Sequence, residues 1–137
     1  FSTRVLQVHL SEKKVDLRKS RIIVAAGMGA SDPRSLQLVQ ELARVLGGEH
    51  AGSRPVVDAG LLPQERQVGQ TGTTVRPTLY IACGISGQVQ HLAGMEESGR
   101  ILAINSDPEA PIFDVAHYGI VGDVADVLPK MIKAAQI

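Results

Sequence analysis

Short apolar runs that end in glycine or a small polar residue constrain the fold of this chain more than any other feature. They occupy residues 21–26, 79–83, 100–105 and 118–121, and residues 49–53 are expected as a further strand. Turns and segments with helical spacing separate these runs. Buried strands that alternate with helices are typical of parallel sheets. The pattern therefore predicts an α/β fold, a doubly wound and mainly parallel sheet with helices on both faces.

Capping residues mark where the helices begin and end. Asp32 and Pro33 suit the cap and first turn of a helix whose apolar spacing runs to the glycine pair at 47–48. Asp123 suits the cap of a final helix that continues through Lys133. We also expect a short helix over residues 87–93 and a loop or short helix over residues 56–63.

Composition narrows the class of protein. Aromatic residues make up 3% of the chain and Trp is absent, so the core must consist of Val, Leu, Ile and Ala. Fourteen basic residues balance fourteen acidic ones. With neither a basic field nor aromatic stacking groups, a nucleic-acid partner is not expected. No apolar run is long enough to predict a membrane span. Cys83 is expected in the core, and the four histidines show no metal-ligand spacing.

The N-terminal segment differs from the rest of the chain. Residues 4–10 alternate polar and apolar side chains, which predicts a half-buried edge strand, and a charged connector follows. We therefore divide the 137 residues into an edge strand with its connector, residues 1–20, and a main domain, residues 21–137. Because the sequence starts at Phe1 without an initiator Met, we expect a fragment or a processed chain.

Glycine-rich loops are expected to meet at one edge of the sheet. Gly27, Ser53, Gly84, Asn105 and Gly122 each follow a predicted strand, and ligands of such sheets bind at the carboxyl ends of the strands. The turn at 84–87 stands between a strand and a helix start, where Ser86 and the backbone amides of Gly87 and its neighbour could hold a diphosphate. A nucleotide cofactor is the first hypothesis, and a plain strand-to-helix turn is its alternative.

Several side chains near these loops allow two interpretations. Arg54 either forms a surface ion pair with Asp58 or serves as a cation over an anionic ring. His91 either bonds to backbone or donates to a ligand carbonyl. Ser86 invites comparison with a nucleophile elbow, but the glycine spacing is wrong and His91 is badly placed as a base, so a serine hydrolase is disfavoured. The glycines at 27 and 29 form half of a dinucleotide fingerprint and are more simply explained as a turn.

Five longer segments carry a resemblance to one family. They lie at residues 53–60, 67–72, 84–95, 103–113 and 118–123, and include Gln-Val-Gly-Gln-Thr-Gly at 67–72 and Gly-Ile-Ser-Gly at 84–87. Together they closely resemble the C-terminal, FAD-binding domain of the electron transfer flavoprotein alpha subunit, from about Arg21 to the C-terminus. The resemblance implies a Rossmann-like or flavodoxin-like domain that is part of a longer alpha subunit.

The resemblance also implies a cofactor and roles for individual residues. FAD would be bound mainly by this domain, and an electron transfer flavoprotein beta subunit would complete the site. Arg54 would lie against the isoalloxazine ring, Thr71 near flavin N5, and His91 toward the carbonyl O2. A cation and a donor near N1 and O2 would stabilise the negative charge of reduced flavin. The remaining positions would be Ser53, Gln67 and Gln70 along the flavin, Gly84, Ser86, Gly87 and Gln90 at the ribityl chain and diphosphate, and Asn105 and Asp123 at the adenosine half.

The implied function is electron transport by a carrier. Electrons would pass from flavin dehydrogenases, such as acyl-CoA dehydrogenases, to a quinone reductase or similar acceptor, in a bacterial cytoplasm or a mitochondrial matrix. The cofactor would carry the chemistry, so no catalytic side chain and no metal site are assigned. A regulatory module that binds AMP or NAD without redox activity is the alternative. One position departs from the family, since Met28 stands where a basic residue is common, and this predicts a shifted flavin potential or altered partner choice.

Overall fold

The computed structural model describes residues 16–136. The edge strand expected over residues 4–10 lies outside the described residues. Five parallel strands form one sheet in the order β2-β1-β3-β4-β5. They are β1 (Ile22–Ala26), β2 (Glu49–Gly52), β3 (Leu79–Cys83), β4 (Arg100–Asn105) and β5 (Tyr118–Val121). This order is that of the flavodoxin-like doubly wound folds, so the predicted fold class is confirmed.

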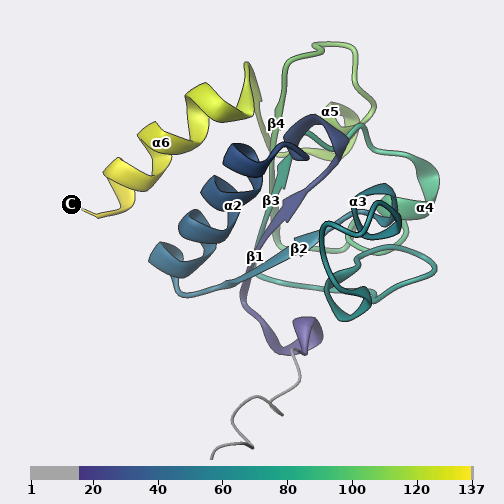
Figure 1. Ribbon diagram of the computed structural model, residues 1–137. Helices are drawn as coiled ribbons and strands as arrows, with labels where there is room; N and C mark the ends of the chain where they lie inside the picture. The colour runs from purple at the N-terminus through teal and green to yellow at the C-terminus, as the bar shows by residue number, and fades with distance from the viewer. Residues whose placement is uncertain (1–15, 137) are drawn as a thin grey trace, which may run out of the picture.

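Helices cover both faces of the sheet (Figure 1). One face carries the two long helices, α2 (Pro33–Leu46) and α6 (Val124–Ala135). The other carries the short helices α3 (Arg54–Asp58), α4 (Val89–Leu92) and α5 (Ile112–Val115), together with the long connection between α3 and β3. Three single turns of 3-10 helix complete the list, η1 (Leu17–Lys19), η2 (Met28–Ala30) and η3 (Gln64–Arg66). None of the helices described is long and apolar enough to cross a membrane.

Alternating side chains of the central strands build the two halves of the core. In β3, Tyr80 and Ala82 face the short helices, whereas Ile81 and Cys83 face α2 and α6. This alternation follows from the period of two along a strand. Both halves consist largely of aliphatic side chains, as the composition predicts, and Cys83 is buried among them.

The capping residues predicted for the two long helices are confirmed. The backbone N–H of Ser35 donates to Asp32 Oδ2 at 3.1 Å, and that of Ala125 donates to Asp123 Oδ1 at 2.9 Å. Gly47 ends α2 in the left-handed conformation, with a φ of 75°. These local signals fix the ends of α2 and α6 against the outer face of the sheet.

Smaller elements differ from the sequence prediction by a few residues. Ser53 is the cap of α3 rather than the end of β2, and α3 begins at Arg54, two residues earlier than the predicted segment. Pro55 fits the first turn of that helix, where its fixed φ is favourable and its missing N–H costs nothing. The helix predicted over residues 87–93 is shorter, and α5 is an addition that the sequence analysis did not predict.

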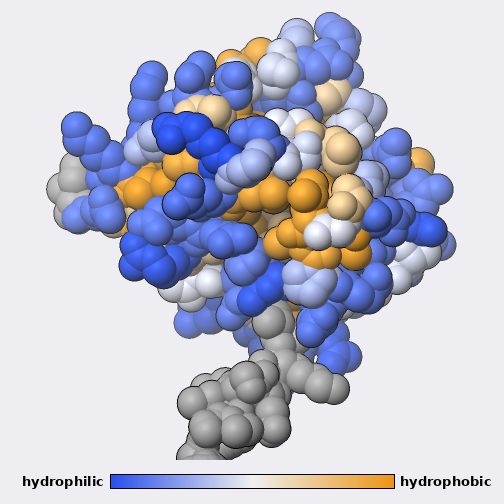
Figure 2. Space-filling model, viewed as in Figure 1, coloured by the Kyte–Doolittle hydropathy of each residue, from blue (hydrophilic) through white to orange (hydrophobic). Residues whose placement is uncertain are grey.

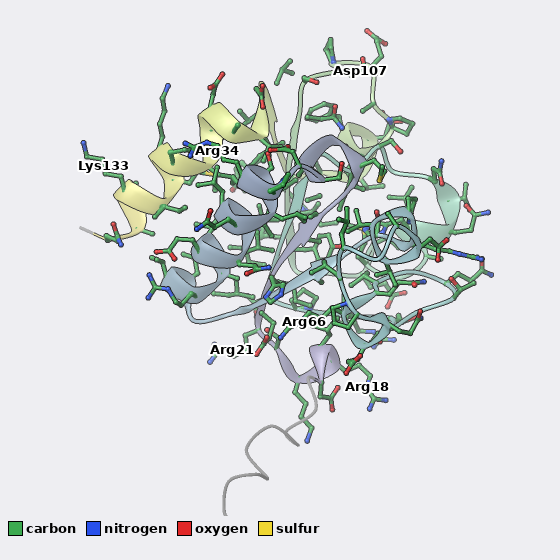
Figure 3. The ribbon with its side chains drawn as sticks, viewed as in Figure 1. Arg18, Arg21, Arg34, Arg66, Asp107 and Lys133 are labelled. Atoms are coloured by element: carbon green, nitrogen blue, oxygen red, sulfur yellow. The ribbon has the colours of Figure 1, made fainter. Side chains whose placement is uncertain are left out.

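Charged side chains lie at the periphery of the fold. In Figure 3, Lys133 and Arg34 point outward from the long helices, and Asp107 lies on the loop after β4. The space-filling view shows hydrophilic residues over most of the same face, with apolar residues gathered near its middle (Figure 2). The labelled charged side chains and the hydrophilic surface therefore lie outside the aliphatic core.

Candidate functional site at the carboxyl ends of the strands

A pocket of about 560 Å³ opens where β1, β2, β3 and β4 end. It lies beside β1 and β3, the two strands at which the winding of the chain changes direction. This is the place where flavodoxin-like sheets bind their ligands. The pocket is lined by Gly27, Met28, Gly29, Ser53, Arg54, Pro55, Asp58, Val68, Thr71, Gly84, Ile85, Ser86, Gly87, Gln88, Gln90, His91 and Asn105.

Backbone atoms from two glycine turns meet beside the pocket. The N–H of Gly27 donates to the Cys83 carbonyl at 2.8 Å, and the N–H of Gly29 donates to the Gly84 carbonyl at 3.0 Å. Gly84 has a φ of 67°, and a Cβ there would meet the backbone of Gly29 and Ala30 at 2.6 Å. Glycine is required at this position for both reasons. The turns thus bring main chain, rather than side chains, up to the ligand space.

Arg54 and Asp58 form an ion pair at the wall of the pocket. Arg54 Nε donates to Asp58 Oδ2 at 3.3 Å, and both side chains are more than half exposed. Their spacing of four residues places them on one face of α3. The expected ion pair is therefore present, and Arg54 also lines the pocket, so its role as a cation over an anionic ring stays a prediction. Exposed pairs of this kind are weak, which leaves the guanidinium available to an anionic ligand.

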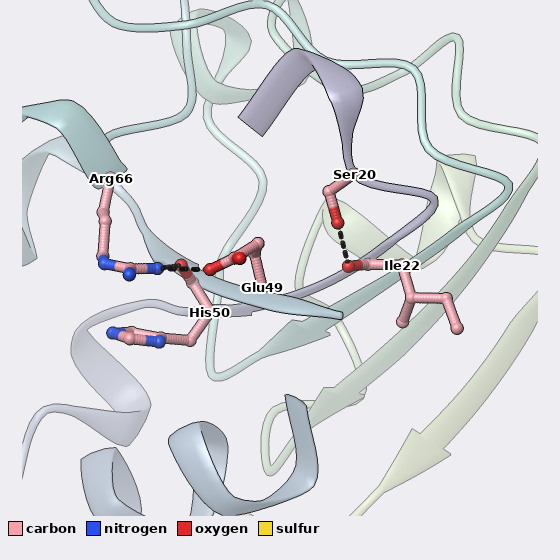
Figure 4. A network of polar contacts seen from close by, with 5 residues as sticks. All are labelled: Ser20, Ile22, Glu49, His50 and Arg66. Atoms are coloured by element: carbon pink, nitrogen blue, oxygen red, sulfur yellow. Dashed lines mark hydrogen bonds and ion pairs between the residues drawn. The ribbon is translucent and has the colours of Figure 1, made fainter. Parts of the chain in front are cut away.

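An anchor on β2 sets the position of the loop that carries Thr71. Arg66 Nη1 donates to Glu49 Oε1 at 3.0 Å and to the His50 carbonyl at 2.8 Å (Figure 4). Burial, reinforced by the nearby Arg66 charge, lowers the pKa of His50 to about 4. The histidine is therefore neutral at pH 7 and does not compete with Arg66 for Glu49. The loop begins at the residue after Arg66.

The loop at residues 67–74 folds onto the segment that contains α4. Gln70 N–H donates to the Gln90 carbonyl at 2.8 Å, and Val75 N–H donates to the Gly94 carbonyl at 2.7 Å. A Cβ on Gly94 would lie 2.5 Å from the Gly69 backbone, so only glycine allows this approach. The contact brings Thr71 and His91, which are far apart in the sequence, to one pocket.

Gln67 orients the Thr71 hydroxyl from below. Gln67 is buried, and its Nε2 donates to Thr71 Oγ1 at 2.9 Å. The hydroxyl oxygen therefore acts as an acceptor within the loop, and its own hydrogen stays available for another acceptor. Thr71 lines the pocket, and its role near flavin N5 stays a prediction.

His91 is buried on the side of the pocket that faces β3. Its Nε2 lies 2.8 Å from the Tyr80 hydroxyl, and Nδ1 is buried without a hydrogen-bond partner among the described residues. Burial lowers its pKa to about 4, against the opposing effect of the Val68 backbone, so the ring is neutral at pH 7. Buried polar atoms are nearly always paired, so an orphaned imidazole nitrogen on a pocket residue marks a place for a ligand atom.

The turn after β3 is held by its neighbours rather than by its own side chains. The Ser86 carbonyl accepts from Ile112 N–H at 2.8 Å, and Asn105 Nδ2 donates to the Ile85 carbonyl at 3.0 Å. Gly87 has a φ of 96°, and a Cβ there would meet Ile112. No hydrogen bond joins Ser86 to a histidine in residues 16–136, since His91 Nε2 is paired with Tyr80. The Ser86 side chain is left to face the pocket.

Nine of the predicted site residues line the pocket and three do not. Ser53, Arg54, Thr71, Gly84, Ser86, Gly87, Gln90, His91 and Asn105 line it. Gln67 supports Thr71 from behind, Gln70 is exposed on the same loop, and Asp123 caps α6. Contacts of these residues with a cofactor stay predictions.

Sequence reasoning missed the apolar members of the site. Val68 and Ile85 line the pocket, and Tyr80 lies behind His91. The sequence around each of these three residues predicts only a buried strand or a loop. The Gly84–Gln88 turn does place Ile85 beside a ligand site, but no signal in the sequence connects Tyr80 with His91.

Fold and site together define a nucleotide-cofactor domain of the flavodoxin-like type. A family model described as the electron transfer flavoprotein FAD-binding domain matches residues 16–96. "Protein FixB" of Clostridium saccharobutylicum is 53% identical over 98% of this chain and 40% of its own length. The electron transfer flavoprotein subunit alpha of Thermoanaerobacterium thermosaccharolyticum is 53% identical over 96% of this chain and 40% of its own length. The mitochondrial subunit alpha of Dictyostelium discoideum is 48% identical over 93% and 36%, respectively.

The chain belongs to the electron transfer flavoprotein alpha-subunit family and forms its FAD-binding domain. It spans about two fifths of the length of these relatives. The predictions of the family and of FAD as the cofactor are confirmed. The pocket suits that cofactor, because it combines close backbone approach at Gly84, a cation at Arg54 and an orphaned nitrogen at His91.

Proposed function

We propose that this domain holds FAD in the pocket at the strand ends and serves an electron carrier made of an alpha and a beta subunit. The observation that carries the proposal is the gathering of Arg54, Thr71 and His91, from three separate segments, around one pocket. Electrons would come from flavin dehydrogenases, such as acyl-CoA dehydrogenases, and would pass to a quinone reductase or similar acceptor. The cytoplasm of a bacterium or the mitochondrial matrix is the corresponding location.

Each part of the pocket has a role in this proposal. FAD supplies reversible uptake of electrons, and the chain supplies orientation and electrostatics. The Arg54 guanidinium attracts the negative charge of the reduced ring, and the Thr71 hydroxyl, held by Gln67, donates at its edge. Ser53, Gln67 and Gln70 support the ring side of the site. Ser86, Gln90 and the amides after Gly84 hold the linking chain, and Asn105 and Asp123 are assigned to the adenosine half.

The beta subunit completes the site. The pocket is open, and Arg54 and Met28 are both more than half exposed beside it. A partner that covers this side would remove water from the ring and strengthen the electrostatic contacts. We therefore expect FAD to be retained more firmly when the beta subunit is present.

Flavin content tests the proposal directly. The full alpha chain is purified with and without its beta subunit, and FAD is quantified from the absorption spectrum after denaturation. We expect about one FAD for each alpha–beta pair and less for the alpha chain alone. A colourless pair that takes up no added FAD would contradict the proposal. Binding of AMP or NAD by such a pair would favour the regulatory module instead.

Substitution of Arg54 tests the electrostatic role. Arg54→Ala is expected to lower the two-electron potential of FAD by about 30 to 60 mV, since a charged hydrogen bond contributes about 1.5 to 3 kcal/mol. Arg76→Ala is the matched control, because Arg76 also forms an exposed ion pair, with Glu97, and does not line the pocket. Redox titration of the FAD-bound protein measures the potential of each variant. Equal potentials in the two variants would remove Arg54 from the assigned role.

Met28 offers a complementary test by adding a charge. Its side chain is 54% exposed and lines the pocket. Met28→Arg is expected to raise the FAD potential or to alter the kinetics with the redox partners, because it introduces a cation near the ring. Stopped-flow reduction and redox titration check the two effects. An unchanged potential together with unchanged kinetics would show that the departure from the family is silent.

A further inference from the structure

Tyr80 is the only side chain among the described residues that hydrogen-bonds to the His91 ring. It projects from β3 into the core half that faces the short helices, and it is fully buried. Its hydroxyl oxygen lies 2.8 Å from His91 Nε2, and the two ring centroids are 6.1 Å apart. A tyrosine hydroxyl that is buried needs a hydrogen-bond partner, and His91 is the partner that the structure provides.

The direction of this hydrogen bond follows from which atoms can be satisfied. Burial raises the pKa of Tyr80 well above its ordinary value, so the phenol keeps its proton. If His91 donated from Nε2, the buried Tyr80 hydrogen would lack an acceptor, and Nδ1 would be a bare acceptor with no donor. If Tyr80 donates, its hydrogen is satisfied and only one group, Nδ1–H, stays free. The second arrangement leaves fewer buried groups unpaired, so it is favoured.

A neighbouring backbone group also acts on the His91 ring. The backbone of Val68 favours the protonated form of the ring, against the larger effect of burial on its pKa. Val68 and His91 both line the pocket. Because Nε2 is paired with Tyr80 and Nδ1 has no hydrogen-bond partner among the described residues, a proton on Nδ1 is the polar hydrogen of the ring that is left for a ligand of the pocket.

We propose that Tyr80 is a positioning residue that donates to His91 Nε2 and so holds His91 as the neutral Nδ1–H tautomer, with its single polar hydrogen reserved for the pocket. The ligand group that this hydrogen suits is an acceptor, such as a carbonyl oxygen of the cofactor ring. This inference rests on the proposed function for its purpose, but the tautomer itself is a property of the chain and can be observed without FAD.

The test reads the tautomer by NMR. The full chain is labelled with ¹⁵N only at histidine, and long-range proton–nitrogen correlations report which ring nitrogen carries the proton. We expect His91 to show a protonated Nδ1 and an unprotonated Nε2. His117 is an internal reference of the opposite kind, because its Nδ1 accepts from Ile101 N–H at 3.0 Å and its proton must lie on Nε2 when it is neutral. The Nε2–H pattern for His91 would overturn the proposal.

Tyr80→Phe separates positioning from packing. The ring is retained and the donor is lost, so we expect an Nε2–H signal to appear for His91 and the His117 pattern to persist. Tyr118→Phe is the matched control, since Tyr118 is 62% exposed on β5, and it should leave both patterns unchanged. A Tyr80→Phe protein that keeps the parent tautomer would also overturn the proposal. If the tautomers behave as expected but no FAD binds, the proposed function fails and this inference stands.

Discussion

Gly84 and Gly60 share a left-handed backbone but differ in their surroundings. Their φ angles are 67° and 78°, respectively. A Cβ on Gly84 would collide with backbone of Gly29 and Ala30, whereas a Cβ on Gly60 would meet nothing within 4 Å. Alanine at Gly60 therefore measures the energetic cost of the left-handed backbone alone. Alanine at Gly84 measures that cost together with the cost of a steric clash.

Alanine at these two positions should destabilise the domain to different extents. Gly60→Ala is expected to lower the free energy of unfolding by about 1 to 2 kcal/mol, the cost of a left-handed non-glycine residue. Gly84→Ala adds a further cost of about 1 to 3 kcal/mol, because backbone must move. Urea unfolding monitored by circular dichroism measures both. Equal losses for the two variants would mean that the backbone at Gly84 does not contact the backbone at Gly29 in solution.

His91 should make the domain sensitive to acid. Its folded pKa of about 4 lies below the unfolded value of 6.5. The unfolded state therefore binds the proton first, and stability is lost as the pH falls from about 6.5 to about 4. The full loss is of the order of 3 kcal/mol.

Removal of the titrating group tests this sensitivity. His91→Gln should show a smaller difference in unfolding free energy between pH 7 and pH 5 than the parent protein. His50, with a similar depressed pKa, stays in both proteins, so some pH dependence will remain. Urea titrations at the two pH values provide the measurement, and identical differences would exclude a buried neutral His91.

The two ring-side residues of the site were reached by different routes. Arg54 was singled out from its place between an expected strand and Pro55, whereas Thr71 was assigned only through the family resemblance, and both line the pocket. Tyr80 was not predicted, because a tyrosine in an apolar strand looks like core. Its second role depends on the contact between β3 and α4, which the sequence does not display.

At the scale of elements, caps determine where the long helices begin. The Ser35 hydrogen bonds hold the pKa of the Asp32 carboxyl below its ordinary value. Asp32→Ala is expected to lower the free energy of unfolding by about 1 kcal/mol, since the backbone N–H of Ser35 in the first turn of α2 loses its acceptor. Asp32→Asn keeps an acceptor and should cost much less. Thermal unfolding of the two variants tests this, and equal losses would show that charge, rather than the cap, matters.

The elements also show where a sequence pattern stops being informative. The ends of α2 were predicted because Asp32, Pro33 and Gly47 are strong local signals. The helix α5 has four residues, fewer than one period of apolar spacing can reveal. The start of α3 was misplaced because residues 49–53 were expected as a strand, whereas Ser53 is the cap of α3 and Pro55 occupies its first turn.

At the scale of the whole molecule, occupation of the pocket should stabilise the fold. A ligand that binds only the folded state raises the unfolding temperature, and at a fixed concentration the shift grows with the logarithm of its affinity. FAD is expected to raise the Tm more than AMP at the same concentration, because only FAD fills the ring side near Arg54, Thr71 and His91. Differential scanning fluorimetry with both ligands provides the comparison. A larger shift with AMP would support the regulatory module.

The arrangement of the sheet was only partly predictable. Alternating strands and helices indicate parallel pairing, and β1 through β5 are all parallel. The order of the strands depends on the side of β1 on which each later strand is added. The chain changes sides between β2 and β3, across a long connection whose apolar residues show little helical or strand periodicity. That connection nevertheless delivers Thr71 to the pocket, so the least regular segment is among the most important for the site.

The glycine turns beside the pocket have a consequence for engineering. At Gly27 and Gly84 the backbone lies directly against other backbone. Any substitution there would displace the main chain that borders the pocket, rather than change the shape of the pocket through a side chain. Variation that re-tunes this domain must therefore act at the rim, through residues such as Met28, Arg54 and Gln90. A library restricted to the rim would explore new potentials and ligands while the framework stays constant.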